Sequence, residues 1–220
     1  MRSISSLCLP EDDSKLIFEK QESVSPALSK RISINLFSTG SSKIHSVMRP
    51  ERITRDDRSG KPFEIGSSCD EDFSFLLEMY RNFSPKPASQ GLPPEDPETC
   101  HNWLKQLFEI GENLLAWRGS RVIGHAALVP DLGGRSAEFV IFVDQNHRNL
   151  GIGTELTRFV LQRSKKLGLD SVWLTVNISN FIAVKLYKKI GFEYCDLDKH
   201  ERVMSIKLGS LKSVDGNSPL

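Results

Sequence analysis

The pattern of hydrophobic and polar positions changes near residue 61. Before that point small polar residues alternate with isolated aliphatic ones, and of the 12 Phe, 3 Trp and 3 Tyr only Phe18 and Phe37 lie there. Such a segment buries too little apolar surface to offset the conformational entropy that it would lose on ordering. We therefore predict a serine-rich, disordered extension over residues 1–60. The alternative is that residues 31–37, which alternate apolar and polar, add a short strand to a sheet edge.

From residue 61 onward the periodicity predicts strands and helices. Apolar residues at helical spacing indicate four helices, which are bounded by capping residues, prolines or glycines. Shorter apolar or alternating runs indicate strands before, between and after them. The expected strands are 62–65, 113–117, 121–128, 136–143, 172–176, 192–194 and 202–208, and the expected helices are 73–83, 97–110, 152–167 and 183–190.

The order of these elements predicts one α/β (α+β) domain over residues 61–208. Three strands at hairpin spacing indicate an antiparallel meander, and the uninterrupted apolar strand 172–176 is typical of a strand buried on both faces. Helices framed by strands favour a central sheet with helices on its faces. We also expect a proline-rich loop over residues 84–97 and a flexible tail over residues 209–220.

Composition and charge exclude several classes of protein. The 29 basic and 28 acidic residues leave a formal charge of +1, which gives no general attraction to nucleic acid or to an anionic membrane. No apolar run reaches the roughly 20 residues that cross a bilayer. Acidic residues 11–13 follow before an apolar signal region has formed, which argues against a secretory signal. The 4 cysteines lack metal-ligand spacing. We expect a soluble, cytoplasmic protein, monomer or homodimer, that binds no metal, nucleic acid or membrane.

The clearest chemical signal lies where the fourth expected strand meets the third expected helix. Gly151 and Gly153 remove side chains there, so that backbone N–H groups at the helix N-terminus can approach phosphate oxygens, and Arg148 adds a positive charge. The pattern GxxxxGK[ST] is absent, and Leu156 replaces the third glycine of GxGxxG, which disfavours ATP hydrolysis and dinucleotide binding. What is present is R-x-x-G-x-G over residues 148–153, for which a purely structural tight turn is the alternative.

Two motifs resemble those of the GNAT superfamily of acyl-CoA-dependent N-acetyltransferases. The first is R-x-x-G-x-G over residues 148–153, which resembles the loop that binds the CoA pyrophosphate. The second, over residues 180–192, is N-x-x-A-x-x-x-Y-x-x-x-G-F, and it follows in the family's order. The resemblance covers residues 61–208. It implies a mixed, mostly antiparallel sheet whose fourth and fifth strands, 136–143 and 172–176, splay apart.

The resemblance also implies acetyl-CoA as co-substrate and a primary amine as acceptor, with direct transfer of the acetyl group. The pantetheine arm would lie between the splayed strands and pair with the fourth strand. Asn180 would hydrogen-bond the arm or a group on the substrate side, and Ala183 would leave space for the arm. The implied cofactor-binding residues are Ile141, Phe142, Val143, Arg148, Asn149, Leu150, Gly151, Ile152, Gly153, Thr154, Asn180, Ala183 and Tyr187.

Acetyl transfer to a protonated amine needs a base, an oxyanion donor and an acid for the departing thiolate. We expect Glu138 to be the base, acting through water, a backbone N–H such as that of Ile141 to be the oxyanion donor, and Tyr187 to be the acid. The alternatives are an exposed, ordinary glutamate and a tyrosine packed in the core. Cys195 has no assigned base, which disfavours a covalent route.

Some residues outside the motifs have two interpretations. His125, inside a strand, is either a substrate-facing base or a satisfied strand histidine. The lysine pairs at 165–166 and 188–189 are either solvated helix faces or contacts for the 3′-phosphate of CoA.

The acceptor groove is expected between the loop 84–97 and the segment 195–201, because the family places the acceptor there. Asp196, Asp198 and Glu201 would favour a cationic amine. The size of the acyl chain stays open. The competing function is a non-catalytic acyl-CoA-binding sensor or interaction module with the same fold.

Overall fold

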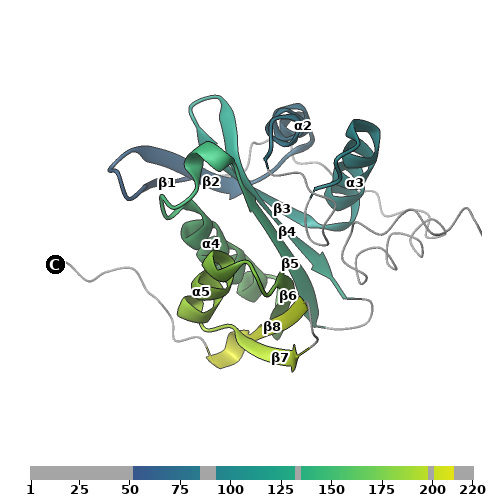
Figure 1. The fold of residues 1–220 in the computed structure, drawn as a ribbon, viewed down its shortest axis with the longest axis vertical. Coiled ribbons are helices and arrows are strands. Elements are labelled where there is room, and N and C mark those ends of the chain that lie inside the picture. The colour runs from purple at the N-terminus through teal and green to yellow at the C-terminus, as the bar shows by residue number, and fades with distance from the viewer. Residues whose placement is uncertain (1–51, 85–92, 132–134, 198–200, 211–220) are drawn as a thin grey trace, which may run out of the picture.

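A sheet of eight strands in the order β1-β2-β3-β4-β5-β6-β8-β7 organises the described residues, which are 52–84, 93–131, 135–197 and 201–210 of this computed structural model (Figure 1). The strands are β1 (Ile53–Asp56), β2 (Pro62–Ser67), β3 (Glu112–Arg118), β4 (Arg121–Pro130), β5 (Ser136–Val143), β6 (Ser171–Asn177), β7 (Glu193–Leu197) and β8 (Glu201–Lys207). The α-helices are α2 (Phe73–Arg81), α3 (Pro97–Ile110), α4 (Ile152–Lys166) and α5 (Phe181–Ile190). The predicted fold class is confirmed.

The sheet begins earlier than the sequence predicted. β1 pairs antiparallel with β2, from Ile53 opposite Ile65 to Asp56 opposite Pro62, although these residues were assigned to the serine-rich extension. The assignment of residues 53–60 to that extension was wrong because β1 is an edge strand with little apolar pattern: Ile53 packs on the core and its three neighbours are exposed. Residues 1–51, with the alternative strand 31–37, lie outside the described residues, as do 85–92 and 211–220.

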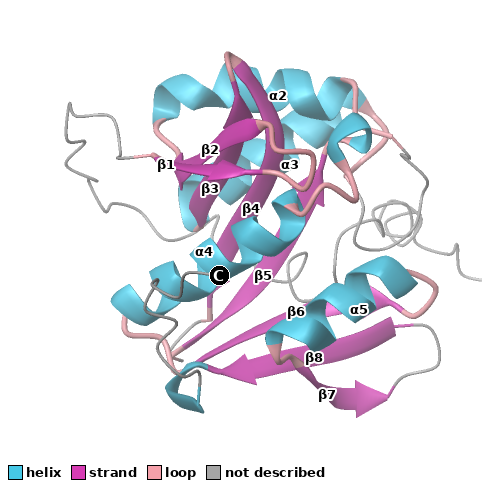
Figure 2. Ribbon diagram, turned by 90° about the vertical axis from the view of Figure 1, so that its left-hand side faces the viewer, coloured by secondary structure: helices cyan, strands magenta, loops and turns pink. Residues whose placement is uncertain are grey.

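β5 and β6 are parallel neighbours for only a short distance. They pair at three positions, from Ser136 opposite Ser171 to Glu138 opposite Trp173. Beyond these positions β5 continues its ladder with β4 and β6 continues its ladder with β8. The two strands therefore diverge, as Figure 2 shows, and the predicted splay is confirmed.

The two faces of the sheet are covered by different helices (Figure 2). α4 and α5 pack on one face, where Leu156 and Tyr187 join Phe139 of β5 in the larger core cluster. α2 and α3 lie over the other face, where Tyr80 and Trp103 enclose the second cluster. Because successive residues of a strand alternate between faces, the central strands β3, β4 and β5 contribute to both clusters, whereas β2, β6 and β8 contribute to the larger one. The predicted helices on both faces are confirmed.

A buried polar network crosses the second cluster. His125 of β4 is fully buried, with Nδ1 2.8 Å from the Tyr80 hydroxyl and Nε2 2.9 Å from Oδ1 of Asn113. The side-chain amide of Asn113 donates to the carbonyls of Leu107 and Gly111, so its Oδ1 is the acceptor for the imidazole. Nε2 therefore carries the proton and Nδ1 accepts from Tyr80. His125 is the satisfied strand histidine and does not face a substrate.

This network predicts a loss of stability in acid. Burial lowers the pKa of His125 to about 3, whereas in the unfolded chain it stays near 6.5. The unfolded state thus binds the proton first, and the free energy of unfolding falls as the pH drops from about 6.5 toward 3, by roughly 1.4 kcal/mol per pH unit. Urea unfolding at about pH 7 and about pH 4 should show a larger loss for the wild type than for His125→Gln. Equal losses would contradict this origin.

Candidate functional site

The segment that joins β5 to α4 forms a tight loop. Asn149 and Gly151 have φ values of +64° and +90°, in the left-handed region, and the Gly151 carbonyl accepts from the N–H groups of Thr154 and Glu155. The N–H of Thr154 is therefore already engaged in a hydrogen bond within the loop. Within the described part of the chain, the N–H groups of residues 149–153 make no hydrogen bond. With the N-terminal end of the α4 dipole, they form a site suited to an anion.

The two glycines of the motif have different physical reasons. Gly151 is needed by the turn, because its left-handed φ strains a residue with a side chain. Gly153 is an ordinary helical position, and a Cβ there would contact Leu186, Val143 and Ile141 side chains at 3.5, 3.6 and 4.0 Å, which are normal van der Waals distances. Packing and backbone conformation therefore do not require glycine at 153. A ligand that approached the backbone closely at residue 153 would require it.

The free edge of β5 presents backbone groups to the gap beside β6. The N–H of Asp144 donates to the carbonyl of Ile123 on β4 at 3.0 Å. The backbone groups of successive strand residues point to opposite edges of the strand. Those of Phe142 therefore also point to β4, whereas those of Ile141 and Val143 point into the gap. An extended chain with amide groups could pair with the latter two residues, as the sequence predicted for the pantetheine arm.

Phe142 packs in the second core cluster and does not face the gap, which corrects the prediction that it binds the cofactor. It is 7% exposed, and its ring packs at 5.6 to 5.8 Å, edge to face, on the rings of Tyr80, Phe83 and Trp103. Its backbone lies opposite His125 in the β4 ladder. The motif alone could not separate Phe142 from its neighbours because the alternation depends on the register with β4.

Arg148 fixes the turn after β5. Its Nε donates to the Val143 carbonyl at 3.1 Å, a terminal N–H donates to the Ser84 carbonyl, and the guanidinium lies 5.1 Å above the Phe83 ring. Partial burial lowers the pKa of Arg148, and Asp144 opposes that shift. Two of its donors are thus engaged by the protein itself. A contact of Arg148 with the pyrophosphate stays a prediction.

A second arginine, Arg58, lies against the loop and was missed by the sequence analysis. It belongs to the turn between β1 and β2. Its backbone N–H donates to the Leu150 carbonyl at 2.9 Å, and Nη1 donates to the Asn149 carbonyl at 3.2 Å. Its side-chain carbons reach within 3.5 Å of a Cβ built on Gly151. No local motif marks Arg58, because it lies about ninety residues before the loop in a segment with weak apolar pattern.

Tyr187 and Glu138 lie on opposite faces of the sheet where β5 and β6 part. Tyr187 is 8% exposed and packs on Phe139 and Phe192, with ring centroids 6.3 and 5.7 Å apart. Burial raises the pKa of Tyr187 above its usual value, so the phenol stays protonated at neutral pH. Glu138, opposite Trp173 in the last paired position, is 1% exposed and therefore not the ordinary exposed glutamate of the alternative. Their catalytic roles stay predictions.

The second motif begins α5. Oδ1 of Asn180 accepts from the Ala183 N–H at 3.1 Å and caps the helix, which leaves the amide NH₂ of Asn180 for other partners. Ala183 packs partly buried against the larger core cluster. Leu150 and Ile152 also direct their side chains to that cluster, so only their backbone groups could serve a ligand.

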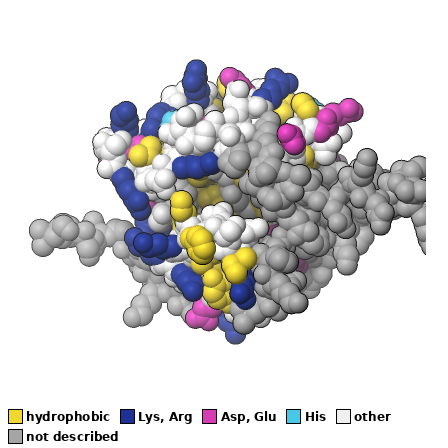
Figure 3. All heavy atoms as spheres, viewed as in Figure 1, with side chains coloured by type: hydrophobic (Ala, Val, Ile, Leu, Met, Phe, Trp, Pro, Cys, Tyr) yellow, Lys and Arg dark blue, Asp and Glu magenta, His cyan; other side chains and the backbone are white. Residues whose placement is uncertain are grey.

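Basic side chains surround this region. Figure 3 shows them gathered on the left of the view, over the β1–β2 hairpin and beside α4 and α5. The predicted lysine pairs 165–166 and 188–189 are exposed on α4 and α5. Of the predicted acceptor groove, residues 85–92 and 198–200 lie outside the described residues, and nothing tests that prediction.

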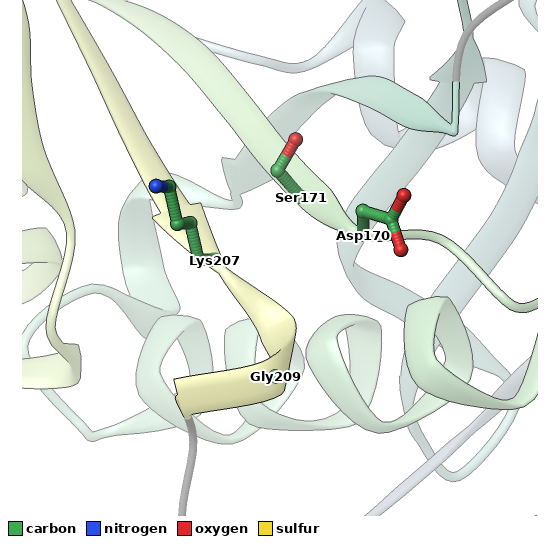
Figure 4. A pocket seen from close by; sticks show the side chains of 4 residues that line it. All are labelled: Asp170, Ser171, Lys207 and Gly209. Atoms are coloured by element: carbon green, nitrogen blue, oxygen red, sulfur yellow. The ribbon is translucent and has the colours of Figure 1, made fainter.

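Two surface hollows are also found among the described residues. One, of about 430 Å³, is lined by Asp170, Ser171, Lys207 and Gly209 at the start of β6 and the end of β8 (Figure 4). The other lies between β1, β2 and α4. The described residues contain no cluster of three or more metal-ligating side chains. Among the same residues, no helix combines the length and the apolar character of a membrane span.

Comparison with known proteins finds relatives of similar sequence. The model of the acetyltransferase (GNAT) family matches residues 75–192, more than half of the chain. A mycothiol acetyltransferase of Geodermatophilus obscurus is 37% identical over 132 residues, 57% of this chain and 42% of that protein. The L-amino acid N-acetyltransferase AaaT of Escherichia coli is 34% identical over 99 residues, 42% of this chain and 61% of that protein. The chain thus spans less than two thirds of either relative.

Solved structures share the fold. The GNAT domain of S. lividans PAT has a TM-score of 0.63 and 14% identity, covering 71% of this chain and 96% of that one. The ribosomal-protein-S18-alanine N-acetyltransferase of Escherichia coli has a TM-score of 0.55 and 17% identity, covering 71% of this chain and 99% of that one. At these identities the likeness concerns the fold alone. Since the family model and the splayed sheet agree, the chain belongs to the GNAT acetyltransferase family.

Proposed function

We propose that this protein transfers an acetyl group from acetyl-CoA directly to a primary amine. The observation that carries the proposal is the juxtaposition of two sets of backbone donors. The N–H groups of residues 149–153 make no hydrogen bond in the described chain, and the free edge of β5 ends just before them. Membership of the GNAT family supports the reaction class.

Acetyl-CoA fits both sets of donors. A diphosphate matches N–H groups at the N-terminus of a helix, with Gly153 leaving room for its approach. The amide groups of a pantetheine arm match the backbone of Ile141 and Val143, which faces the gap. The Val143 carbonyl already accepts from Arg148, so the Val143 N–H and the Ile141 carbonyl would hold the arm, which leaves the Ile141 N–H for the thioester carbonyl.

When bound, acetyl-CoA supplies an activated thioester. Glu138 removes the proton of the acceptor amine through a water molecule, since a buried carboxylate beside the point of divergence can reach the gap from one face. The N–H of Ile141 stabilises the negative charge that develops on the carbonyl oxygen. Tyr187, protonated at neutral pH and located on the other face, donates its proton to the departing sulfur.

The reaction is tested by release of free CoA. Acetyl-CoA is incubated with the full chain and a panel of amines: L-amino acids, polyamines, aminoglycosides and lysine peptides. We expect release that depends on one class of amine. Binding of CoA without amine-dependent release across the panel would instead favour the non-catalytic sensor, and absence of CoA binding would contradict both functions.

Gly153→Ala should separate binding from folding. Alanine is favoured over glycine inside a helix by about 1 kcal/mol, and the added Cβ has normal contacts, so the melting temperature should stay equal or rise. The Kd for acetyl-CoA, measured by calorimetry, should increase about tenfold or more because the methyl group occupies space near the diphosphate.

Gly168→Ala is the control for that variant. Gly168 has a φ of +73° with nothing within 4 Å of a built Cβ, and it follows the far end of α4. This substitution should lower stability through backbone strain and leave the Kd unchanged. An unchanged Kd in Gly153→Ala would contradict the proposed approach of the diphosphate.

Tyr187→Phe should lower kcat by roughly 10²-fold or more, with little change in KM for acetyl-CoA, because the variant lacks the proton for the leaving thiolate. The hydroxyl makes no hydrogen bond to the described residues, so the melting temperature should change little. Tyr194→Phe, on the partly exposed Tyr194 of β7, is the matched control and should retain full activity. A normal kcat in Tyr187→Phe would remove Tyr187 from the mechanism.

A further inference from the structure

The β1–β2 hairpin contacts the proposed diphosphate loop from outside the region that the family model matches. That model begins at residue 75, whereas the hairpin spans residues 53–67. The hairpin is therefore not part of the signature by which the family is identified.

The turn of the hairpin is held in one conformation by Asp57. Oδ1 of Asp57 accepts from the Ser59 N–H and hydroxyl at 2.7 and 2.6 Å and from the Lys61 N–H at 3.1 Å, and Oδ2 pairs with Arg118 of β3. The hydrogen bonds from Ser59, with those of Lys61 and Arg118, lower the pKa of Asp57 well below its usual range. The carboxylate thus stays charged at neutral pH and anchors the turn to the sheet.

Arg58 follows Asp57 and is directed at the loop by this turn. Two hydrogen bonds join it to consecutive loop residues, from its N–H to the Leu150 carbonyl and from its Nη1 to the Asn149 carbonyl. Its Cγ lies 3.5 Å from the position that a Cβ on Gly151 would occupy. These residues belong to the segment 149–153, whose N–H groups make no hydrogen bond among the described residues. The guanidinium therefore lies beside the proposed anion site. The turn that carries it is already held in one conformation by Asp57, so it does not need to reorganise.

The other arginines near the loop are occupied. Arg148 donates to two backbone carbonyls, and Arg55 and Arg158 both pair with Glu155 in the first turn of α4. Arg58 is exposed, donates one side-chain hydrogen bond, and has no acidic partner among the residues that the structure describes. Its remaining donors are available to an anion.

We propose that Arg58 binds the phosphate groups of acetyl-CoA and that the hairpin positions it for this contact. The inference rests on the proposed function, because it needs CoA to occupy the loop. Arg148 then serves chiefly to fix the turn after β5, and the charge that neutralises phosphate comes from a segment about ninety residues earlier in the chain.

Calorimetric titration of CoA tests the contact at several salt concentrations. Arg58→Gln should raise the Kd about tenfold or more at low salt, and the difference from the wild type should shrink as salt screens the charge. Arg58→Lys keeps the charge and should retain the salt dependence of the wild type. Arg135→Gln removes an equal charge from an exposed residue paired with Asp170, at the opposite end of β5, and should leave the Kd unchanged.

The outcomes distinguish the two proposals. If the wild type binds CoA and Arg58→Gln has a normal Kd, the role of Arg58 is wrong while the proposed function stands. If Arg58→Gln weakens binding by the same factor at every salt concentration, Arg58 only supports the loop and the phosphate contact is wrong. If the wild type fails to bind CoA, the proposed function itself fails, and with it the ligand assigned to Arg58.

Discussion

The architecture depends on the short parallel pairing between β5 and β6. Each strand has a full antiparallel partner on its outer edge, with seven register positions between β4 and β5 and seven between β6 and β8, but the two share only three. Because both are held from outside, they cannot close the gap without breaking an outer ladder. The inner edge of β5 is therefore left with backbone groups that need a partner, and buried backbone groups without one are costly. A ligand with amide groups would satisfy that requirement.

The gap also explains why the two proposed catalytic side chains come from opposite faces. Within a continuous sheet, Glu138 and Tyr187 would be separated by a hydrogen-bonded ladder. Where the ladder ends, a group that lies in the plane of the sheet can be reached from both sides. The divergence begins directly after Glu138, and the Tyr187 ring packs on Phe139, the next residue of the same strand. The two core clusters thus lie on opposite faces of β5 at the position where β5 and β6 part.

Sequence periodicity predicted the strands and helices whose faces are buried, and the two motifs predicted the splay, because both signals are local. What the sequence could not predict depends on contacts between distant segments. β1 carries one partly buried aliphatic residue beside three exposed polar ones, so it has no strand pattern of its own. The exclusion of Phe142 from the gap follows from its register with β4, and the position of Arg58 follows from its contact with Leu150 and from the pairing of Asp57 with Arg118. These contacts join segments that are far apart in sequence, so no short motif encodes them.

The loop shows how one motif serves two physical purposes. Gly151 satisfies the left-handed turn that begins α4, which is the structural explanation that six residues of sequence could not exclude. Gly153 and the free N–H groups have no such explanation, since the described protein could accommodate a side chain there. The two arginines at the loop also differ in role: Arg148, within the motif, bonds to carbonyls of the protein, whereas Arg58, outside it, keeps donors available. The conformation of the loop is thus fixed by residues that are near it in sequence. The proposed capacity to bind an anion is completed by the β1–β2 hairpin, which the sheet places beside the loop.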